Sequence, residues 1–325
     1  MSVTAFSESR GANPVRDVLY LAGPTASGKS DVALWLAPRM EAEIISVDSM
    51  QVYRGLDVGT AKPSAQERAL VRHHLIDVSN LDEPFDAARF VRLAGEAIDD
   101  IRRRGRVALL CGGTGLYFKA WMEGLGAAPA GDPVLRAVLE SQPLESLLCE
   151  LKEKDPVTFE RIDRMNPRRV VRAVEVLRLT GRPFSDQRSD WAGKAAAPRP
   201  DFLWLDRDRS DLQRRVEMRV DRMLCSGWVE ETRRAMASGL GRNPVALQAI
   251  GYRLLAEHLD GARDLESTAE RIRIETRQFA KRQGTWFRKQ ASSVRLVVAA
   301  GDSIESVGRR VLAHWEGFLS SMPSD

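Results

Sequence analysis

The stretch that decides the fold class is GPTASGKS, which consists of Gly23, Pro24, Thr25, Ala26, Ser27, Gly28, Lys29 and Ser30. It follows a short apolar run, Val18 to Ala22, and opens a helical pattern. Glycines at this spacing let backbone N–H groups converge on an anion, and the helix dipole adds to the attraction. Lys29 supplies a point charge, and Ser30 supplies a hydroxyl suited to Mg²⁺ between phosphates. The stretch predicts a site for a diphosphate or triphosphate, but not what is done with it.

Short apolar runs with helical patterns between them place this loop in a larger sheet. We expect strands at Val18 to Ala22, Glu43 to Val47, Val107 to Cys111, Phe202 to Leu205 and Val294 to Val298. Strands that alternate with helices form parallel sheets covered on both faces. The sequence therefore predicts an α/β protein, with a doubly wound parallel sheet flanked by helices.

The alternation stops between about Gly124 and Pro200, where turn-rich ends enclose two helical patterns. This segment predicts an all-helical insertion between two strands of the sheet. The predicted parts are a loose tail at 1–16, a core of 17–124 and 200–316, the insertion at 125–199, and a second tail at 317–325.

Composition excludes several classes of protein. The chain has 325 residues, of which 43% are hydrophobic and 29% charged, so it can bury a full core and is not disordered throughout. The net charge of +4 allows a basic patch but not a uniformly basic protein. Cys111, Cys149 and Cys225 lie far apart, which indicates neither a disulfide framework nor a zinc site. No run reaches the roughly 18 apolar residues of a spanning helix, so we expect a cytoplasmic protein without membrane contact.

Two further loops follow predicted strands. Asp48 comes directly after the second strand, at the sheet edge where open α/β sheets hold their ligands. It could hold a metal ion in phosphoryl transfer, accept a proton from a nucleophile, or only cap the next turn. The third strand ends in Gly112-Gly113-Thr114, where glycines allow close approach of the backbone and Thr114 offers a hydroxyl.

Basic residues gather on helical patterns. The helix that Asn166 and Pro167 begin, and that Thr180-Gly181 ends, carries Arg168, Arg169 and Arg172 in its first turns, where the helix dipole disfavours cations. An anionic partner would offset that cost, and a face paired with Glu175 is the alternative.

Two later helical runs are expected from about Asp211 to Gly239 and from Ser267 to Lys289, the second with a capping box of Ser267 and Glu270. Their candidate contacts to phosphate oxygens are Arg215, Arg219, Arg273, Arg277 and Lys281, with Trp286 and Phe287 following as aromatic neighbours. The four histidines are adjacent or remote, which favours local hydrogen bonding over metal binding.

Seven motifs in series resemble the bacterial tRNA dimethylallyltransferase family, also called tRNA isopentenylpyrophosphate transferases. They are GPTASGKS (23–30), ISVDSMQVYRGLDVGTAK (45–62), HHLID (73–77), GGTGLY (112–117), NPRRVVRAVEV (166–176), AIGYR (249–253) and TRQFAKRQGTWFR (276–288). The resemblance implies a P-loop kinase fold whose loop holds the diphosphate of an isoprenoid donor in place of the tail of a nucleotide such as ATP. The implied reaction transfers a dimethylallyl group from dimethylallyl diphosphate to N6 of adenine 37, beside the anticodon of a tRNA.

The same resemblance implies roles for individual residues. Asp48 is the expected proton acceptor, Thr114 lies at the reaction centre, and the loop with Lys29, Ser30, Arg219 and Mg²⁺ would stabilise the departing diphosphate. The expected tRNA contacts are Asp48, Ser49, Met50, Gln51, Thr114, Arg136, Asn166, Pro167, Arg168, Arg169, Val170, Gln248, Ala249, Ile250, Gly251 and Tyr252, to which the charge pattern adds Arg277.

Three other functions compete with this one. A small-molecule P-loop kinase would use Asp48 for Mg²⁺ or a substrate hydroxyl, an adenylate isopentenyltransferase would modify a free nucleotide, and a switch protein would hydrolyse a nucleotide while bound to RNA. The arginine-rich insertion favours a macromolecular acceptor, namely the anticodon stem and loop of tRNA, bound by a monomer.

Overall fold

The computed structural model describes residues 18–187, 199–290 and 293–321, so the predicted tail at 1–16 lies outside the described residues. The chain divides into two compact units, one made of Met1–Phe118 and Ala195–Asp325 and the other of Lys119–Lys194. No helix in the described ranges is both long and apolar enough to cross a bilayer.

The first unit is built on a parallel sheet in the order β3-β2-β4-β1-β5-β6. The strands are β1 (Val18–Ala22), β2 (Ala42–Val47), β3 (His73–His74), β4 (Val107–Gly112), β5 (Arg199–Arg207) and β6 (Ser293–Val298). The predicted fold class and the five predicted strands are confirmed. The sequence missed β3, because its two half-buried histidines form no apolar run.

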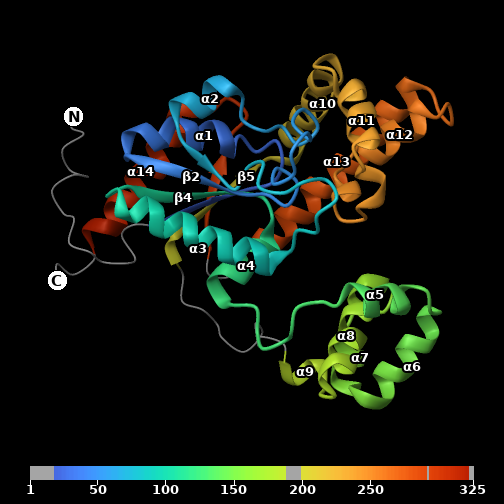
Figure 1. Cartoon of the computed structure of the whole chain (residues 1–325). Helices are drawn as coiled ribbons and strands as arrows, with labels where there is room; N and C mark the ends of the chain where they lie inside the picture. Colours follow the sequence, from blue (N-terminus) through green and yellow to red (C-terminus); the bar gives the residue numbers. More distant parts are fainter. Residues whose placement is uncertain (1–17, 188–198, 291–292, 322–325) are drawn as a thin grey trace. The chain divides into compact units, whose positions relative to one another are not determined.

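Helices cover both faces of the sheet, as Figure 1 shows. Helices α1 (Lys29–Leu36) and α14 (Ile304–Ser320) pack together on one face over a core that includes Leu19, Leu109 and Trp315. On the other face lies α3 (Ala87–Arg103), and α4 (Gly115–Glu123) begins there, with Phe118 against the rings of Tyr20 and Phe202. The predicted boundary at 316 is too early, because α14 continues to Ser320. Residues 322–325 of the predicted second tail are not described.

A helical layer of the same unit packs side by side in Figure 1. It consists of α10 (Arg209–Cys225), α11 (Trp228–Ala237), α12 (Tyr252–Leu259) and α13 (Leu265–Arg288). The predicted single run to Gly239 is wrong, because Gly227 adopts a φ of 91° that interrupts it. The predicted capping box is also wrong. Asp264 caps α13 by accepting a hydrogen bond from the N–H of Ser267.

Short helices complete both units. In the first unit they are α2 (Ala65–Leu70) and the 3₁₀ turns Ala37–Arg39, Leu240–Arg242 and Ala246–Gln248. The described part of the second unit holds α5 (Pro133–Glu140), α6 (Leu144–Lys154), α7 (Pro156–Arg161), α8 (Pro167–Thr180) and α9 (Phe184–Gln187). The expectation of two helical patterns there is wrong, because proline at the first position starts several short helices.

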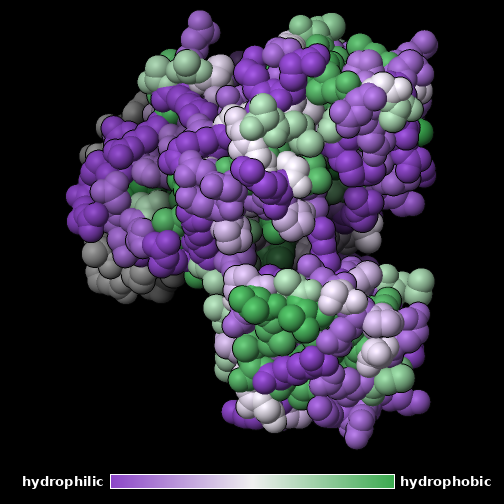
Figure 2. All heavy atoms as spheres, turned by 45° about the vertical axis from the view of Figure 1, so that its right-hand side comes forward, coloured by the Kyte–Doolittle hydropathy of each residue, from purple (hydrophilic) through white to green (hydrophobic). Residues whose placement is uncertain are grey.

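The ends predicted for α8 are confirmed, with the side chain of Asn166 capping its first turn and Gly181 following its last. This unit has its own core, formed by Leu139, Leu147, Leu151, Val170 and Val174. Figure 2 shows apolar side chains gathered on one face of it, and Val134, Val138 and Met165 are among its exposed apolar residues.

Candidate active site

The three predicted loops meet at the carboxyl ends of β1, β2 and β4. The N–H of Gly23 donates to the carbonyl of Gly112 over 3.2 Å, which joins the first loop to the third. The N–H groups of Gly113 and Thr114 both donate to the carbonyl of Val47, each over 3.2 Å, which joins the third loop to the second. The convergence expected from parallel strands is thus present in the fold.

The phosphate loop is held in shape by side chains from distant elements. Arg207 at the end of β5 donates to the carbonyl of Ser27 over 2.7 Å, and Arg215 on α10 donates to the carbonyl of Ala26 over 2.9 Å. Two guanidinium groups therefore lie against the loop. Because they take up its carbonyls, they also favour a conformation in which the loop can present amide groups to an anion.

A cleft of about 1220 Å³ opens beside this loop, within the first unit. The phosphate loop, α1, α10 and the segment from Gln51 to Arg68 line it. Lys29 and Arg219 both line the cleft, and burial is the largest of the effects that lower the pKa of each. In the described part of the chain no carboxylate lies within ion-pair distance of Arg219 or Lys29. Partly desolvated cations without a paired carboxylate are the electrostatic environment that a bound anion stabilises.

Asp48 and Thr114 lie together beside the phosphate loop. One carboxylate oxygen of Asp48, Oδ1, accepts hydrogen bonds from the N–H groups of Met50, at 2.8 Å, and Gln51, at 3.3 Å. The hydroxyl of Thr114 accepts one from the N–H of Ser49 at 3.2 Å. Of the three alternatives for Asp48, the structure shows that it caps the next turn. Its Oδ2 makes no hydrogen bond within the described ranges, so the capping function leaves one oxygen for chemistry.

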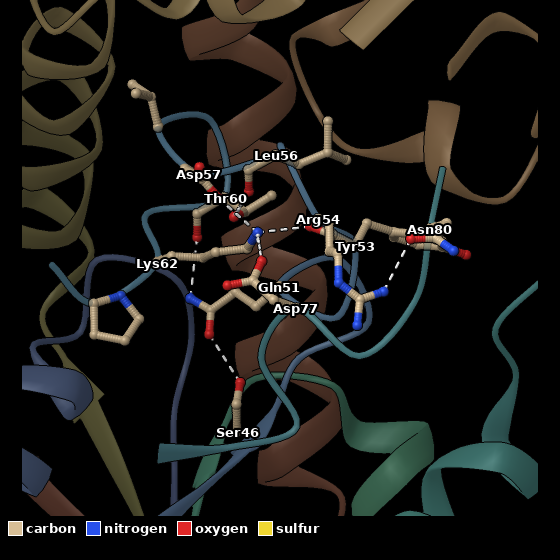
Figure 3. Close-up of polar contacts among 12 residues, drawn as sticks. Ser46, Gln51, Tyr53, Arg54, Leu56, Asp57, Thr60, Lys62, Asp77 and Asn80 are labelled. Carbon is tan, nitrogen blue, oxygen red and sulfur yellow. Dashed lines mark hydrogen bonds and ion pairs between the residues drawn. The ribbon is translucent and has the colours of Figure 1, made fainter. Parts of the chain in front are cut away.

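The segment that follows Asp48 is held in shape by the side chains of two of its own residues, Gln51 and Lys62, whose polar contacts Figure 3 shows. Gln51 accepts a hydrogen bond from Ser46 at 2.8 Å and donates to the carbonyls of Thr60, at 3.2 Å, and Ala61, at 3.0 Å. Its amide is therefore occupied inside the protein. Gln51 lines the cleft, and its side chain cannot contact the base expected beside it without breaking these bonds.

The second brace of this segment is Lys62, whose side chain is 1% exposed. Its ammonium group donates to the carbonyl of Tyr53 at 2.6 Å and to the carboxylates of Asp57, at 2.6 Å, and Asp77, at 2.5 Å. Figure 3 shows these groups converging. The segment from Gln51 to Lys62 therefore forms a rigid wall of the cleft.

Glu231 on α11 anchors this wall, and sequence reasoning missed it. Its carboxylate accepts hydrogen bonds from the N–H groups of Asp57, Val58 and Gly59, at 2.7 to 3.0 Å, and from the hydroxyl of Tyr252 at 2.6 Å. The sequence feature that could have indicated its role is a glutamate three residues after Trp228, on the helix face that also carries Thr232 and Ala235. A charge on the inner face of a helix needs partners, and here a loop provides them.

A family model described as IPP transferase matches residues 51–290. The chain is 45% identical over 273 residues to tRNA dimethylallyltransferase 1 of Citrifermentans bemidjiense. This match covers 84% of this chain and 89% of that protein. It is also 45% identical to tRNA dimethylallyltransferase of Geobacter metallireducens, over 85% of this chain and 91% of that one. This chain belongs to the IPP transferase family.

Solved structures agree with this membership of the IPP transferase family. The tRNA isopentenylpyrophosphate transferase of Bacillus halodurans matches with a TM-score of 0.67 at 34% identity, over 94% of this chain and 100% of that one. A eukaryotic dimethylallyltransferase acting on tRNA matches with a TM-score of 0.75 at 26% identity, over 95% and 80%. The similarity extends over almost the whole fold.

The family resemblance also implied tRNA contacts, and the structure divides these positions into two groups. Val170, Ala249 and Tyr252 have buried side chains, and Tyr252 is fully enclosed with its hydroxyl on Glu231. A tRNA contact at these three positions stays a prediction, and it would involve the backbone, because their side chains belong to the protein core. Gln248 is exposed, and it lines a pocket of about 370 Å³ together with Ile250.

The predicted contacts in the second unit differ in their pairing. Arg168 and Arg169 are exposed on the first turn of α8, and neither has an ion pair among the described residues. Arg136 and Arg172 instead bind the buried carboxylate of Glu175, at 2.8 and 2.7 Å. The alternative of a helix face paired with Glu175 therefore holds for Arg172, whereas Arg168 and Arg169 are available to an anion.

On α13, the expected stripe of free charge is wrong in part. Arg277 pairs with Glu217 at 3.0 Å and with Glu270 at 3.2 Å, and Arg273 pairs with Asp221 at 2.5 Å. Phe287, expected as an aromatic contact, is fully buried against Trp204. Glu270 is part of the same helix, whereas Glu217 and Asp221 come from α10 and have no signature in the sequence of α13.

Each histidine makes a hydrogen bond, but only two of these bonds are local, as expected: His73 bonds the carbonyl of Val71 at 2.7 Å, and His258 bonds that of Arg263 at 2.9 Å. His74 instead bonds Glu43 at 2.7 Å, and His314 bonds the carbonyl of Pro200 at 2.9 Å. In the described ranges no group of three or more His, Cys, Asp or Glu side chains is arranged to hold a metal ion.

Proposed function

We propose that this protein transfers the dimethylallyl group of dimethylallyl diphosphate to N6 of adenine 37 in the anticodon loop of tRNA, as a cytoplasmic monomer. The observation that carries the proposal is that a cationic cleft and a proton-accepting carboxylate belong to neighbouring loops at one edge of the sheet. Lys29 and Arg219, which have no carboxylate partner among the described residues, line the cleft beside the phosphate loop. Asp48 and Thr114 follow the neighbouring strands, and they carry a proton-accepting oxygen and a hydroxyl.

The proposed chemistry separates charge at the allylic carbon. As its C–O bond lengthens, negative charge collects on the departing diphosphate, where Lys29, Arg219 and the loop amides lie in a partly desolvated cleft. Preorganised cations and dipoles of this kind lower the barrier because they need not reorganise during the reaction. The same groups bind the diphosphate before transfer and orient the isoprenoid.

The acceptor must lose a proton. The lone pair of adenine N6 is delocalised into the ring, so its attack is assisted when a base takes the proton as the C–N bond forms. Oδ2 of Asp48 is suited to this, since Oδ1 is held by the turn and fixes the direction of the carboxylate. Thr114, whose oxygen accepts from Ser49, can donate its own hydroxyl proton to the base or to a phosphate oxygen.

A magnesium ion fits the donor set at the phosphate loop. Ser30 is exposed at the start of α1 and lines the cleft, with Asp31 as its neighbour, and Mg²⁺ prefers oxygen ligands together with phosphates. Ser30 and the donor's diphosphate would hold the ion, which neutralises charge on the leaving group when bound.

The nearest alternative is transfer of the same group to free adenylate. Exposed Arg168 and Arg169 favour the larger acceptor, because arginines without carboxylate partners contact a phosphate backbone. The adenine must leave the base stack to reach any such site, at a cost of a few kcal/mol.

The test is one assay with three acceptors. The protein is incubated with dimethylallyl diphosphate, Mg²⁺ and either unmodified tRNA, AMP or a mixture of metabolites with ATP. We expect prenylated adenosine only in the nuclease digest of the tRNA. Prenylated AMP, or a phosphorylated metabolite, would contradict the proposal.

A further inference from the structure

Gln283 on α13 bridges two of the three loops, and no role was expected for it. Its Oε1 accepts the N–H of Thr25 in the phosphate loop at 2.8 Å. Its Nε2 donates to the carbonyl of Gly113, the residue before Thr114, at 2.9 Å. The orientation of the amide is unambiguous, because an N–H can only donate and a carbonyl can only accept.

The bridge closes a ring of hydrogen bonds around the site. From Gly113 the chain continues to Thr114, whose hydroxyl accepts from Ser49 beside Asp48. Both Gly113 and Thr114 also donate to the end of β2. The ring therefore links the phosphate loop, which is proposed to hold the diphosphate, to the groups proposed to receive the adenine. Gln283 is its only member from α13.

The fit around Gln283 is close. The side chain is 9% exposed. A Cβ added at Gly113 would come within 2.4 Å of its Nε2, so that residue must be glycine for the amide to reach the carbonyl. One helical turn further along α13, the ring of Trp286 would lie 2.4 Å from a Cβ at Gly115. The helix thus backs both loops as one rigid surface.

The hydrogen bond to Gln283 also determines which backbone amides of the phosphate loop remain available to an anion. Because the N–H of Thr25 is engaged by Gln283, it is not presented to a phosphate. The anion is left to the amides nearer α1, whose N-terminus begins at Lys29. An amide side chain is needed for the bridge, since it alone combines a carbonyl acceptor and an N–H donor at this length.

We propose that Gln283 is a positioning residue, which fixes the separation between the diphosphate-holding loop and the Thr114 loop so that donor carbon and acceptor nitrogen meet in line. It acts through the backbone of both loops and touches neither substrate. The inference rests on the proposed prenyl transfer. A displacement of about 1 Å between reacting groups is enough to slow a reaction about 100-fold, so a bridge of this kind has measurable consequences.

The test compares two variants with a control in the full chain. Gln283→Met keeps the size of the side chain and removes both hydrogen bonds. Gln283→Glu keeps the acceptor for Thr25 but turns an oxygen toward the carbonyl of Gly113. Gln66→Met, at an exposed position on α2, is the matched control. Single-turnover transfer to tRNA is measured with both substrates saturating, and the affinity for each substrate alone is measured by calorimetry and filter binding.

We expect the single-turnover rate to fall about 10- to 100-fold in Gln283→Met and further in Gln283→Glu, with each substrate's Kd within about threefold of the wild type. Gln66→Met should match the wild type. If Gln283→Met is poorly folded by thermal melting, Gln283→Leu, which also removes both hydrogen bonds, takes its place and should show the rate loss expected for Met.

Two outcomes overturn the inference. One is a rate within threefold of the wild type in both variants. The other is a rate loss that disappears once the affinity loss or unfolded fraction is taken into account, which would make Gln283 a binding or stability residue. In either case the wild type still prenylates tRNA. An inactive wild type would instead overturn the proposed function, and this inference with it.

Discussion

Two pairs of arginines with the same spacing lie on neighbouring helices and do different things. Arg215 and Arg219 on α10 line the cleft, where Arg215 holds the phosphate loop and Arg219 has no carboxylate partner among the described residues. Arg273 and Arg277 on α13 are neutralised by carboxylates, two of which come from α10 itself. Helix α10 therefore turns an acidic face to α13 and a basic one to the cleft. Spacing alone does not distinguish a ligand-binding arginine from a structural one, whereas the presence of a carboxylate partner does.

The largest effect is expected at Asp48, the proposed proton acceptor. Asp48→Asn can still accept the N–H of Met50 and keep the turn, but it cannot take a proton. We expect turnover to fall about 10²- to 10⁴-fold, with tRNA affinity little changed. Asp48→Ala removes the turn cap as well, and its additional loss reports the capping function. Equal and small losses in both variants would leave Asp48 with no part in proton transfer.

A somewhat smaller effect is expected from the unpaired arginine. Arg219→Gln should lower kcat/KM for the donor about 10²- to 10³-fold, because a partly desolvated charge facing the diphosphate is lost. Arg273→Gln on α13 is the matched control and should change donor kinetics by less than about threefold, since an exposed ion pair contributes about 0.2 to 1 kcal/mol. Steady-state kinetics with varied donor check both. Similar losses of kcat/KM in the two variants would show that the lack of a carboxylate partner does not distinguish Arg219 from Arg273.

The next effect concerns stability. Glu231→Gln places an amide N–H₂ against N–H donors of the Asp57–Gly59 loop, so we expect a decrease of about 2 to 3 kcal/mol in the free energy of unfolding. Glu230→Gln, which loses only an exposed pair with Arg233, should cost less than about 1 kcal/mol. Urea titrations measure both. A Glu231 variant as stable as the Glu230 variant would show that the loop is held by packing alone.

A smaller effect is expected on RNA affinity. Arg168→Ala, which removes an unpaired arginine, should weaken tRNA binding several-fold and reduce the slope of log K against log salt by about 0.7 to 0.9. Arg277→Ala should reduce that slope less, because Glu217 and Glu270 already balance its charge. Filter binding between 50 and 200 mM salt measures both slopes. A larger change for Arg277 would mean that its ion pairs open on binding.

The smallest effect is expected from a paired carboxylate of the second unit. Burial by itself would raise the pKa of Glu175, but hydrogen bonds from Arg136 and Arg172 outweigh it and hold the pKa below its ordinary value. A carboxylate with a lowered folded pKa stabilises the fold above its unfolded pKa of about 4.3, and this contribution is lost as the pH falls through the folded pKa. The protection factors of the α8 amides, which take account of the slower intrinsic exchange at low pH, should therefore decrease as the pH falls below about 4.3 in the wild type. In Glu175→Gln, exchange of α8 should depend less on pH.

The sequence by itself determined the α/β class, the position of five strands and the three loops at one edge of the sheet. Apolar runs and glycine spacing are local signals, and each loop directly follows its strand. The helix ends of α8 could be predicted for the same reason, because Asn166 and Gly181 are local signals. The expectation for Asp48 was correct about its place, although only the fold showed that one oxygen is spent on the turn.

Only the tertiary structure decided which charges are free. Glu231 and Gln283 hold loops far from them in the chain. Tyr252 and Phe287 are enclosed by residues that no local pattern connects to them. Side chains on one helix carry no record of what packs opposite. The pairing of Arg277 with α10, and the absence of such pairing for Arg219, therefore depended on how the helices pack, since charge balance is a property of neighbours in space.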